Sequence, residues 1–224
     1  VLHAGDSDTG RTRLGDMVLS VDCFVLDPRY SENCWVIHTH ENPWAIVVDP
    51  GGDPALLGAE GVETAAILVT HTDVDHISGV AELAELSGAD VWAPAGEADA
   101  LRTGETRGGF TVRAHEPDHL VQGGDTIDIA GLELDVVDVP GHTSGHVAYH
   151  VDGKLFSGDV LFAGSVGRVD MPGGDWQSLV DSIRMLVERF GPDTEVYPGH
   201  GPITTLGREL ESNPFLHELR SAER

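Results

Sequence analysis

The sequence predicts a mixed α and β protein built from two similar layers of sheet and helix. Three observations lead to this class. Short apolar runs rich in β-branched and aromatic residues recur along the chain, with turn signals between them. Longer stretches place apolar residues at helical spacing. Both kinds of segment occur in each half, roughly residues 17–103 and 109–212, without a long linker between the halves.

The predicted strands are residues 18–26, 34–37, 44–48, 65–69, 127–129, 132–139, 146–151 and 155–157. Asp152 and Gly153, between the last two runs, form a dipeptide typical of a tight hairpin. Helical spacing covers residues 77–86 and 179–187. The glycine-rich stretch 103–109 joins the halves, and we expect Arg107 to lie there in an exposed loop. We treat residues 1–16 as a polar, poorly ordered segment and residues 17–224 as one domain.

Composition and charge exclude several classes of protein. The 224 residues are 40% hydrophobic, which excludes general disorder, and no apolar run of about 18 residues could span a membrane. Thirteen basic residues against 38 acidic ones give a net charge of −25, with Lys154 as the single lysine. Such a surface repels phosphate backbones and anionic lipids, so we expect neither nucleic acid nor membrane as a partner. The acids are interpreted as a well-solvated surface or, in part, as groups that hold cations.

The two cysteines, Cys23 and Cys34, fall in neighbouring predicted strands. We expect two buried small hydrophobic side chains, with a disulfide as the alternative. Residues 1–16 lack the apolar region of a secretion signal. A cytoplasmic location is therefore expected.

Four side chains that can hold a metal ion lie within six residues: His71, Asp73, Asp75 and His76. They follow the apolar run 67–69 and precede a predicted helix, so they stand at the carboxyl end of a strand, the usual place for a site in such folds. The alternative is a polar turn that caps the helix, with Asp75 as its first capping residue.

Three further groups repeat this context. His142, Asp159 and His200 each follow an apolar strand-like run and stand beside a glycine, where the backbone can turn tightly. Imidazole and carboxylate together suit zinc, iron or manganese. Groups of this kind at four strand ends favour a metal site over four unrelated surface residues.

At these positions the sequence resembles a known family. Residues 70–76, 140–146, 157–162 and 198–201 are similar to the signature blocks of the metallo-β-lactamase superfamily, and the resemblance extends from about residue 18 to 216. Smaller matches at residues 32–35, 48–51, 162–168, 171–175, 204–207 and 213–215 resemble the short glyoxalase II-like, or hydroxyacylglutathione hydrolase-like, branch. The resemblance implies a four-layer αββα sandwich with a binuclear metal centre at one edge of the two sheets.

The resemblance also implies seven metal ligands and two divalent ions, zinc or iron, with manganese as a third option. The first ion would be held by His71, Asp73 and His142, the second by Asp75, His76 and His200, and both by Asp159. A metal-bound hydroxide would be the nucleophile, and Asp75 would orient it as a catalytic residue. Two cations lower the pKa of bound water and stabilise the oxyanion that forms on attack.

Asp73 departs from the family pattern, which has histidine at this position. Three carboxylates and one hydroxide neutralise two divalent ions completely, so the centre is less positive and grips anions more weakly. Such a centre favours the binding of iron or manganese relative to zinc. Three interpretations stay open: Asp73 is a ligand, it points away and leaves an effectively mononuclear centre, or it marks an inactive member.

Other residues have two interpretations. Arg168 binds an acidic substrate or pairs with Asp170 or Asp159. Tyr149 is a candidate substrate-binding residue in the groove, although alternation along a strand places either it or its neighbour inward in any fold. Asp49 orients a metal-bound histidine or stabilises a turn.

The expected function is metal-dependent hydrolysis of a thioester or related acyl ester, with a small-molecule acyl-thiol as substrate. Only 24 residues follow His200, and larger glyoxalase II enzymes use a C-terminal helical domain to bind glutathione, so another thiol is equally credible. One alternative is a mononuclear iron oxidoreductase like the persulfide dioxygenases, whose iron is held by the counterparts of His71, His142 and Asp159. Flavodiiron proteins have a carboxylate at the position of Asp73 but also a flavin domain, which has no counterpart here. The other alternative is a non-catalytic metal-binding member.

Overall fold

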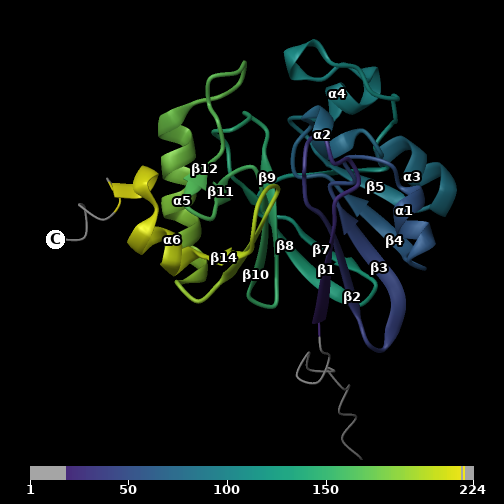
Figure 1. Cartoon of the computed structure of the whole chain (residues 1–224), viewed down its shortest axis with the longest axis horizontal. Coiled ribbons are helices and arrows are strands. Elements are labelled where there is room, and N and C mark those ends of the chain that lie inside the picture. The colour runs from purple at the N-terminus through teal and green to yellow at the C-terminus, as the bar shows by residue number, and fades with distance from the viewer. Residues whose placement is uncertain (1–18, 218, 220–224) are drawn as a thin grey trace, which may run out of the picture.

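Two six-stranded sheets pack face to face, and helices cover the outer face of each (Figure 1). The computed structural model describes residues 19–217 and 219. The predicted N-terminal segment, residues 1–16, lies outside them, as do the first two residues of the predicted domain. The four layers are those of the predicted αββα sandwich, so that fold prediction is confirmed.

The first sheet has the order β1-β2-β3-β4-β5-β6 and carries the helices of the N-terminal half. Its elements are β1 (Leu19–Phe24), β2 (Cys34–Thr39), β3 (Asn42–Val48), α1 (Ala55–Ala59), β4 (Glu63–Leu68), α2 (Val74–Ile77), α3 (Val80–Ser87), β5 (Asp90–Pro94), α4 (Ala98–Thr103), the short 3₁₀ turn η2 (Arg107–Gly109) and β6 (His119–Val121).

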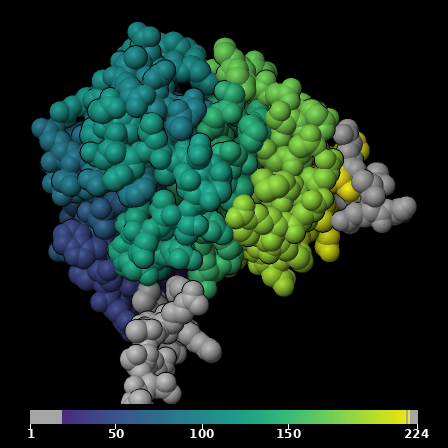
Figure 2. Space-filling model, turned by 180° about the vertical axis from the view of Figure 1, so that it is seen from behind, coloured from purple at the N-terminus to yellow at the C-terminus, as the bar shows by residue number. Residues whose placement is uncertain are grey.

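The second sheet has the order β14-β13-β10-β9-β8-β7. Its elements are β7 (Thr126–Ile129), β8 (Leu132–Asp138), β9 (Val147–Val151), β10 (Lys154–Gly158), α5 (Trp176–Phe190), β13 (Glu195–Pro198), β14 (Thr204–Thr205), α6 (Leu206–Ser212) and η3 (Pro214–Leu216), with the small hairpin of β11 (Leu161–Phe162) and β12 (Ser165–Val166) beside it. Seen from behind, the two halves of the chain occupy opposite sides of the molecule (Figure 2).

Three buried apolar clusters correspond to the three interfaces of four layers. One lies between the sheets and includes Leu68, Leu134 and Phe156. The second packs α3 against the first sheet, and the third packs α5 against the second sheet. The period-2 alternation of β8 and the helical spacing of α5 produce these faces, because each element has apolar residues on the side that it buries.

Local signals account for several element ends. Asp152 and Gly153 have φ values of 48° and 72°, as a tight hairpin between β9 and β10 requires. The Asp175 side chain accepts a hydrogen bond from the Ser178 amide and so caps α5. Gly88 ends α3 in the left-handed region at φ 71°.

Two boundary predictions are corrected. The first sheet extends through β6, so the crossover between sheets falls at the turn that precedes β7 and not at residues 103–109. The predicted helix over residues 77–86 is two helices, α2 and α3, because the backbone turns at Ser78 and Gly79. An added Cβ at Gly79 would lie 2.2 Å from the Gly52 carbonyl oxygen, so only glycine allows this close approach.

The two cysteines have different surroundings. Cys34 is buried as predicted, whereas Cys23 is exposed on edge strand β1, and both are free thiols. The disulfide alternative is therefore not formed. No helix among the described residues is long and apolar enough to cross a membrane.

Candidate metal centre

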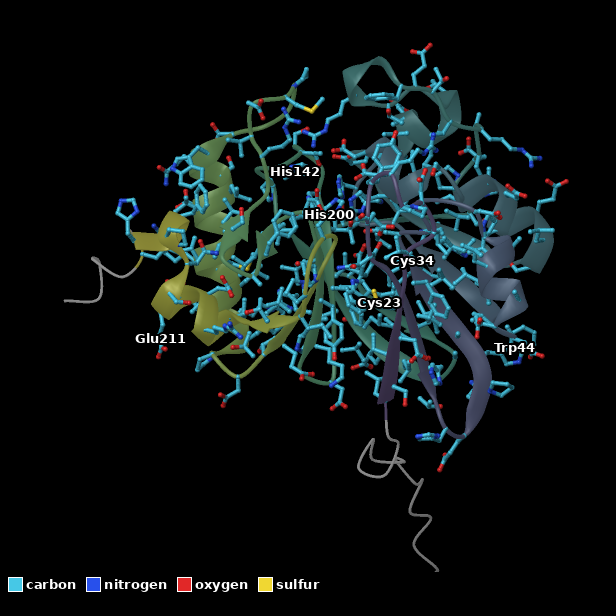
Figure 3. All side chains as sticks on the ribbon, in the orientation of Figure 1. Cys23, Cys34, Trp44, His142, His200 and Glu211 are labelled. Carbon is cyan, nitrogen blue, oxygen red and sulfur yellow. The ribbon has the colours of Figure 1, made fainter. Side chains whose placement is uncertain are left out.

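The predicted ligands come from four strand ends that meet at one edge of the sandwich. β10 runs parallel to β13 and, through two antiparallel pairings, in the same direction as β8. The carboxyl ends of these three strands therefore lie at the same edge of the second sheet. The loop after β4 faces them from the first sheet, and Figure 3 shows His142 and His200 near each other between the two halves.

The loop after β4 supplies four of these groups. α2 begins at Val74, and the residue before it, Asp73, makes no side-chain capping bond. Asp75 lies inside the first turn of α2, so the alternative in which it caps the helix is wrong. Neither carboxylate is used to hold the helix, and both are free to face the opposite sheet.

Three sets of side chains in this region lie close enough to hold a metal ion; in one of them, Asp49, His71 and His76, the Asp49 carboxylate already accepts from His76 and Thr70, which leaves two. They are His71, His142 and Asp159, and Asp75, His76 and His200. Asp159 Oδ1 lies 3.4 Å from His76 Nε2, and Asp159 Oδ2 lies 3.7 Å from the Nε2 atoms of both His142 and His200. Ligands on one tetrahedral zinc ion at 2.0–2.1 Å are separated by about 3.4 Å. Asp159 therefore stands between the two sets, where the sequence prediction placed a bridging ligand.

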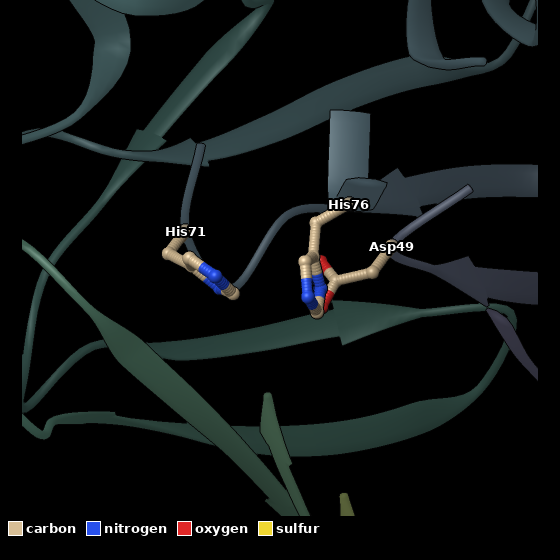
Figure 4. A group of neighbouring side chains, drawn as sticks. All are labelled: Asp49, His71 and His76. Carbon is tan, nitrogen blue, oxygen red and sulfur yellow. The ribbon is translucent and has the colours of Figure 1, made fainter. Parts of the chain in front are cut away.

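Asp49 controls which ring nitrogen of two histidines faces the centre (Figure 4). The Nδ1 atom of His76 lies 3.0 Å from Asp49 Oδ2 and donates to it. The Thr70 hydroxyl donates to the same oxygen at 2.6 Å, so its own oxygen accepts from Nδ1 of His71 at 3.0 Å. Both rings thus carry a proton on Nδ1 and turn Nε2 toward the centre, as metal-binding histidines do.

His142 and His200 are oriented by backbone carbonyl groups. Nδ1 of His142 donates to the Arg168 carbonyl oxygen at 2.8 Å, and Nδ1 of His200 lies 3.3 Å from the Ser31 carbonyl oxygen. A carbonyl can only accept, so Nδ1 carries a proton in each of these rings and Nε2 is the atom left to face the centre. Four histidines from three segments therefore turn the same ring atom toward one place.

Several buried polar atoms of the centre lack a protein partner. His71 Nε2, His76 Nε2 and Asp159 Oδ1 are buried without a hydrogen bond. Unpaired buried polar atoms are costly and uncommon, and three of them converging on one point is the signature of a site made for an ion. The residues present therefore fit the divalent ions that the sequence predicted.

The electrostatics of the centre keep its carboxylates ionised. Burial alone would raise the pKa of Asp159, but His76, His142 and His200 outweigh it, and the pKa is lowered. The pKa of Asp75 is lowered for the same kind of reason, with the hydrogen bond to His200 opposing burial. Burial lowers the pKa of His71 well below its ordinary value, so that ring is neutral. Burial opposes the effect, but Asp159 and Asp49 raise the pKa of His76, and Asp75 raises that of His200. Metal binds ionised carboxylates and neutral imidazole, so an ion would displace the protons on these two Nε2 atoms.

Asp73 faces the centre but is held by an arginine. Its Oδ2 lies 3.2 Å from His142 Nε2 and 3.8 Å from His71 Nε2, which are ligand-like separations. Both of its oxygens also accept hydrogen bonds from Arg107, whose side chain is only 12% exposed. The loop is exposed at Gly108 and Gly109, as predicted, but η2 turns the Arg107 side chain inward, so the prediction is wrong for that residue. Burial opposes ionisation of Asp73, yet the neighbouring His142 and Arg107 side chains lower its pKa to about 2.

A groove of about 440 Å³ opens above these groups. Its walls are mainly apolar, and the lining side chains outside the ligand set include Tyr30, Phe110, Phe162, Val166 and Met171. Phe110 follows η2 directly and is 51% exposed. The groove thus combines a polar floor with an apolar mouth, a combination suited to a small organic substrate.

The two substrate-binding predictions have different outcomes. Arg168 lines the groove but forms a two-point ion pair with Asp170, with both bonds at 2.7 Å, which was the alternative weighed for it. Tyr149 is fully buried between the sheets, where its hydroxyl donates to the Val69 carbonyl oxygen at 2.9 Å. Tyr149 cannot contact a substrate, so that prediction is wrong: strand alternation turned it inward and His150 outward.

Two buried or half-buried acids near the centre were not predicted from the sequence. Glu97 accepts from the Thr72 amide and hydroxyl at 2.9 and 2.6 Å and from the Gly145 amide at 3.2 Å, so it ties the two histidine loops together. Glu32 is buried, with Oε1 3.9 Å from His76 Nδ1, and burial raises its pKa. Glu32 lies in a block that resembled the family, whereas Glu97 carries no sequence signal.

A four-layer αββα sandwich with histidines and aspartates at one edge of its sheets defines a class of metalloprotein. Comparisons with known proteins identify the same class. The chain belongs to the metallo-β-lactamase superfamily, whose family model matches residues 27–200. This membership confirms the family that the motifs predicted.

More particular relatives are hydroxyacylglutathione hydrolases. The chain is 33% identical over 201 residues to hydroxyacylglutathione hydrolase GloC of Haemophilus influenzae, with 84% of this chain and 94% of the relative covered. It is 43% identical over 173 residues to a hydroxyacylglutathione hydrolase of Methylobacillus flagellatus, covering 74% of this chain and 60% of that protein. These names bear out the predicted resemblance to the glyoxalase II-like branch.

Solved structures show the same similarity. The chain superposes on the BLEG-1 B3 metallo-beta-lactamase with a TM-score of 0.81 at 33% identity, covering 88% of this chain and 100% of that one. It is similar to TTHA1623 in a di-iron-bound form with a TM-score of 0.72 at 36% identity, covering 87% and 100%. The superfamily binds divalent metal ions, which accords with the donor set described above.

Proposed function

We propose that this protein is a metal-dependent hydrolase that cleaves a thioester or related acyl ester, as glyoxalase II enzymes do. The observation that carries the proposal is the convergence of four histidine Nε2 atoms and two ionised carboxylates, Asp75 and Asp159, at the floor of an apolar groove. The hydroxyacylglutathione hydrolase relatives support the choice of a thioester.

The proposed ion-holding residues are His71, Asp73, Asp75, His76, His142, Asp159 and His200. Divalent ions held there, zinc or iron or manganese, polarise an acyl carbonyl and lower the pKa of water at neutral pH. Asp75, whose Oδ2 lies 3.2 Å from His200 Nε2, is the carboxylate proposed to orient the attacking water.

The later steps of the hydrolysis need little from the side chains of this protein. Water adds to the acyl carbon, the carbon–sulfur bond breaks, and a thiolate leaves with the bonding electrons, giving a carboxylic acid and a thiol once protons are redistributed. A thiol has a pKa near 8.5, so no strong general acid is required to expel it. The apolar groove walls, Phe110 and Phe162 among them, exclude water from the rest of the substrate. The predicted cytoplasmic location stays a prediction.

Release of a thiol from thioesters, and of a phenol from aryl esters, tests the hydrolase proposal. The protein is stripped of metal, reloaded separately with zinc, iron(II) or manganese, and assayed on a panel of acyl-glutathione, acyl-N-acetylcysteamine and aryl esters. We expect hydrolysis that disappears on chelation and returns on reloading, and at least a hundredfold loss in Asp159→Asn because that carboxylate faces both ligand sets. Absence of hydrolysis on the whole panel with every ion would exclude the proposal.

A mononuclear iron oxidoreductase is the second candidate, because His71, His142 and Asp159 form a set that could hold one ion. Oxygen uptake with a glutathione persulfide, dependent on iron, distinguishes it from the hydrolase. Arg107 speaks against it, since its Nη2 atom lies 2.5 Å from the Nε2 atom of His142 that this set requires.

A further inference from the structure

Arg107 enters the metal centre from a segment that belongs to none of the four strand ends. It stands at the start of η2, between α4 and β6, and 34 residues separate it from Asp73. Its Nε and Nη2 atoms bond the two oxygens of Asp73, and its Nη1 atom donates to the His142 carbonyl oxygen at 2.7 Å. The guanidinium group is thus held by four acceptor atoms of two proposed ligands, the fourth being Nε2 of His142.

The position of Nη2 is that of a bridging cation. Nε2 of His142 accepts from Arg107, because it lies 2.5 Å from Nη2, too close for two N–H groups, and Nδ1 holds the ring proton on the Arg168 carbonyl. It lies 3.2 Å from the ionised Oδ2 of Asp73, so two lone pairs face each other. Such a pair needs a proton donor or a metal ion between its members. Arg107 Nη2 lies 2.5 Å from each of them and fills that role.

We propose that Arg107 is a built-in competitor for the first metal position, so that an ion binds Asp73 and His142 only when the guanidinium group leaves. The inference rests on the proposed metal centre and is independent of the substrate. Over residues 19–217, no ion pair joins Asp75, His76 or His200 to an arginine or lysine. The second position has no such competitor and fills first.

Charge favours the same order of binding. The carboxylates of Asp73, Asp75 and Asp159 carry three negative charges, which one divalent ion and the Arg107 guanidinium balance. A second divalent ion added with Arg107 in place would leave these three carboxylates with two positive charges in excess, before Asp49 and any hydroxide are counted. Two cations close together in a partly buried site repel strongly, so the guanidinium group must move out as the ion enters.

The same pair explains why the chain has a carboxylate at position 73. A carboxylate accepts two parallel bonds from a guanidinium group, whereas a neutral imidazole offers a single acceptor. Asp73 and Arg107 therefore form a matched pair, and the departure from the family histidine and the inward arginine are one feature. A centre built this way holds one ion tightly and admits the other only at higher free metal concentration.

Metal binding by the intact protein tests the proposal without any substrate. Metal-free protein is dialysed against buffered free Zn²⁺ over several decades, and bound zinc is counted by elemental analysis; Co²⁺ absorption reports the coordination of each ion. We expect the wild type to bind one equivalent tightly and the second at least about tenfold more weakly. Arg107→Gln binds the second equivalent at least about tenfold more tightly than wild type, since the charged hydrogen bonds from Arg107 no longer oppose the ion.

The matched control is Arg102→Gln, which removes the same charge from the exposed face of α4, where Arg102 pairs with Asp99 and Glu116. It should titrate like the wild type. Arg107→Lys, which keeps the charge but not the two-point contact, should fall between wild type and Arg107→Gln and gives a second variant if one folds poorly.

A reciprocal effect separates competition from a purely structural role. Without metal, Arg107→Gln should unfold at a lower temperature than wild type, because Asp73 and His142 lose the cation between them; with saturating Zn²⁺ the difference should shrink or reverse. Identical zinc titrations for wild type and Arg107→Gln would overturn the proposal, as would equal tightening in Arg102→Gln or a protein that binds no ion. Confirmed competition in a protein that cleaves no thioester would leave this inference standing and the hydrolase proposal rejected.

Discussion

Asp49 Oδ2 lies 3.0 Å from Nδ1 of His76, and through the Thr70 hydroxyl the same oxygen also fixes His71. One buried carboxylate thus sets the proton position of two proposed ligands. Its backbone adopts φ 52°, a left-handed conformation that non-glycine residues seldom take. Asp49 therefore combines the two roles weighed for it from the sequence, a turn and a support for a ligand.

Replacing Asp49 by Asn should weaken metal binding. The amide keeps the shape of the side chain but removes the charge and one acceptor, so His71 and His76 lose the partner that holds their protons on Nδ1. Loss of such a supporting acceptor costs about 10–100-fold in metal affinity. Competition with a chromogenic chelator measures the effect, and Asp128→Asn, on the exposed face of β7, is the control. Unchanged affinity in Asp49→Asn would refute the supporting role.

Gly199→Ala should disrupt the centre by direct contact. A Cβ at this position would lie 2.3 Å from Asp159 Oδ1 and 2.6 Å from a ring carbon of His76. We expect bound metal to fall below half of the wild-type content at equal free zinc. Gly58→Ala in α1, whose Cβ meets nothing within 4 Å, is the matched control. That substitution should raise the free energy of unfolding by about 0.5–1 kcal/mol, since alanine favours the helix.

Tyr149→Phe separates a core role from a substrate-binding role. Removing the hydroxyl leaves the buried Val69 carbonyl without this partner, at a cost of about 1–3 kcal/mol in the free energy of unfolding. Denaturant unfolding measures that loss. Because the ring lies between the sheets, KM for any thioester substrate should stay at the wild-type value. A several-fold rise in KM without a loss of stability would return Tyr149 to the substrate groove.

Metal removal should lower the melting temperature. The unpartnered Nε2 atoms of His71 and His76 and the Oδ1 atom of Asp159 gain a partner only when an ion binds. An ion at about 100 times its Kd adds about 2.7 kcal/mol to the free energy of unfolding. Thermal unfolding with and without a chelator measures this difference. An equal melting temperature in the two conditions would show that the donor atoms do not bind the ion.

The sequence predicts the layers of the fold better than their boundaries. Runs such as β8 alternate over seven residues and are readable, whereas β6 has three residues and β13 four, too few for a period to show. The end of the first half was misplaced for this reason. α4 and α6 were also missed, since helices of six and seven residues contain fewer than two full turns.

The candidate centre was predictable where the chemistry stands at strand ends. His142 and His200 follow this rule, and parallel strand direction brings them together. Arg107 does not stand at a strand end. Its side chain points inward because of the path of its loop and because of its partner Asp73, 34 residues away. The prediction for Tyr149 was wrong for a different reason. Alternation assigns the residues of a strand to two faces, and only packing against the other sheet decides which face lies between the sheets.

Crystals grown without metal and soaked in Zn²⁺ give the most direct test of the central claim, through anomalous diffraction at the zinc edge. The account predicts a strong peak within about 2.3 Å of the Nε2 atoms of His76 and His200 and of a carboxylate oxygen of Asp75. A map with no peak at these atoms under saturating zinc, or with peaks only at surface carboxylates, would contradict it.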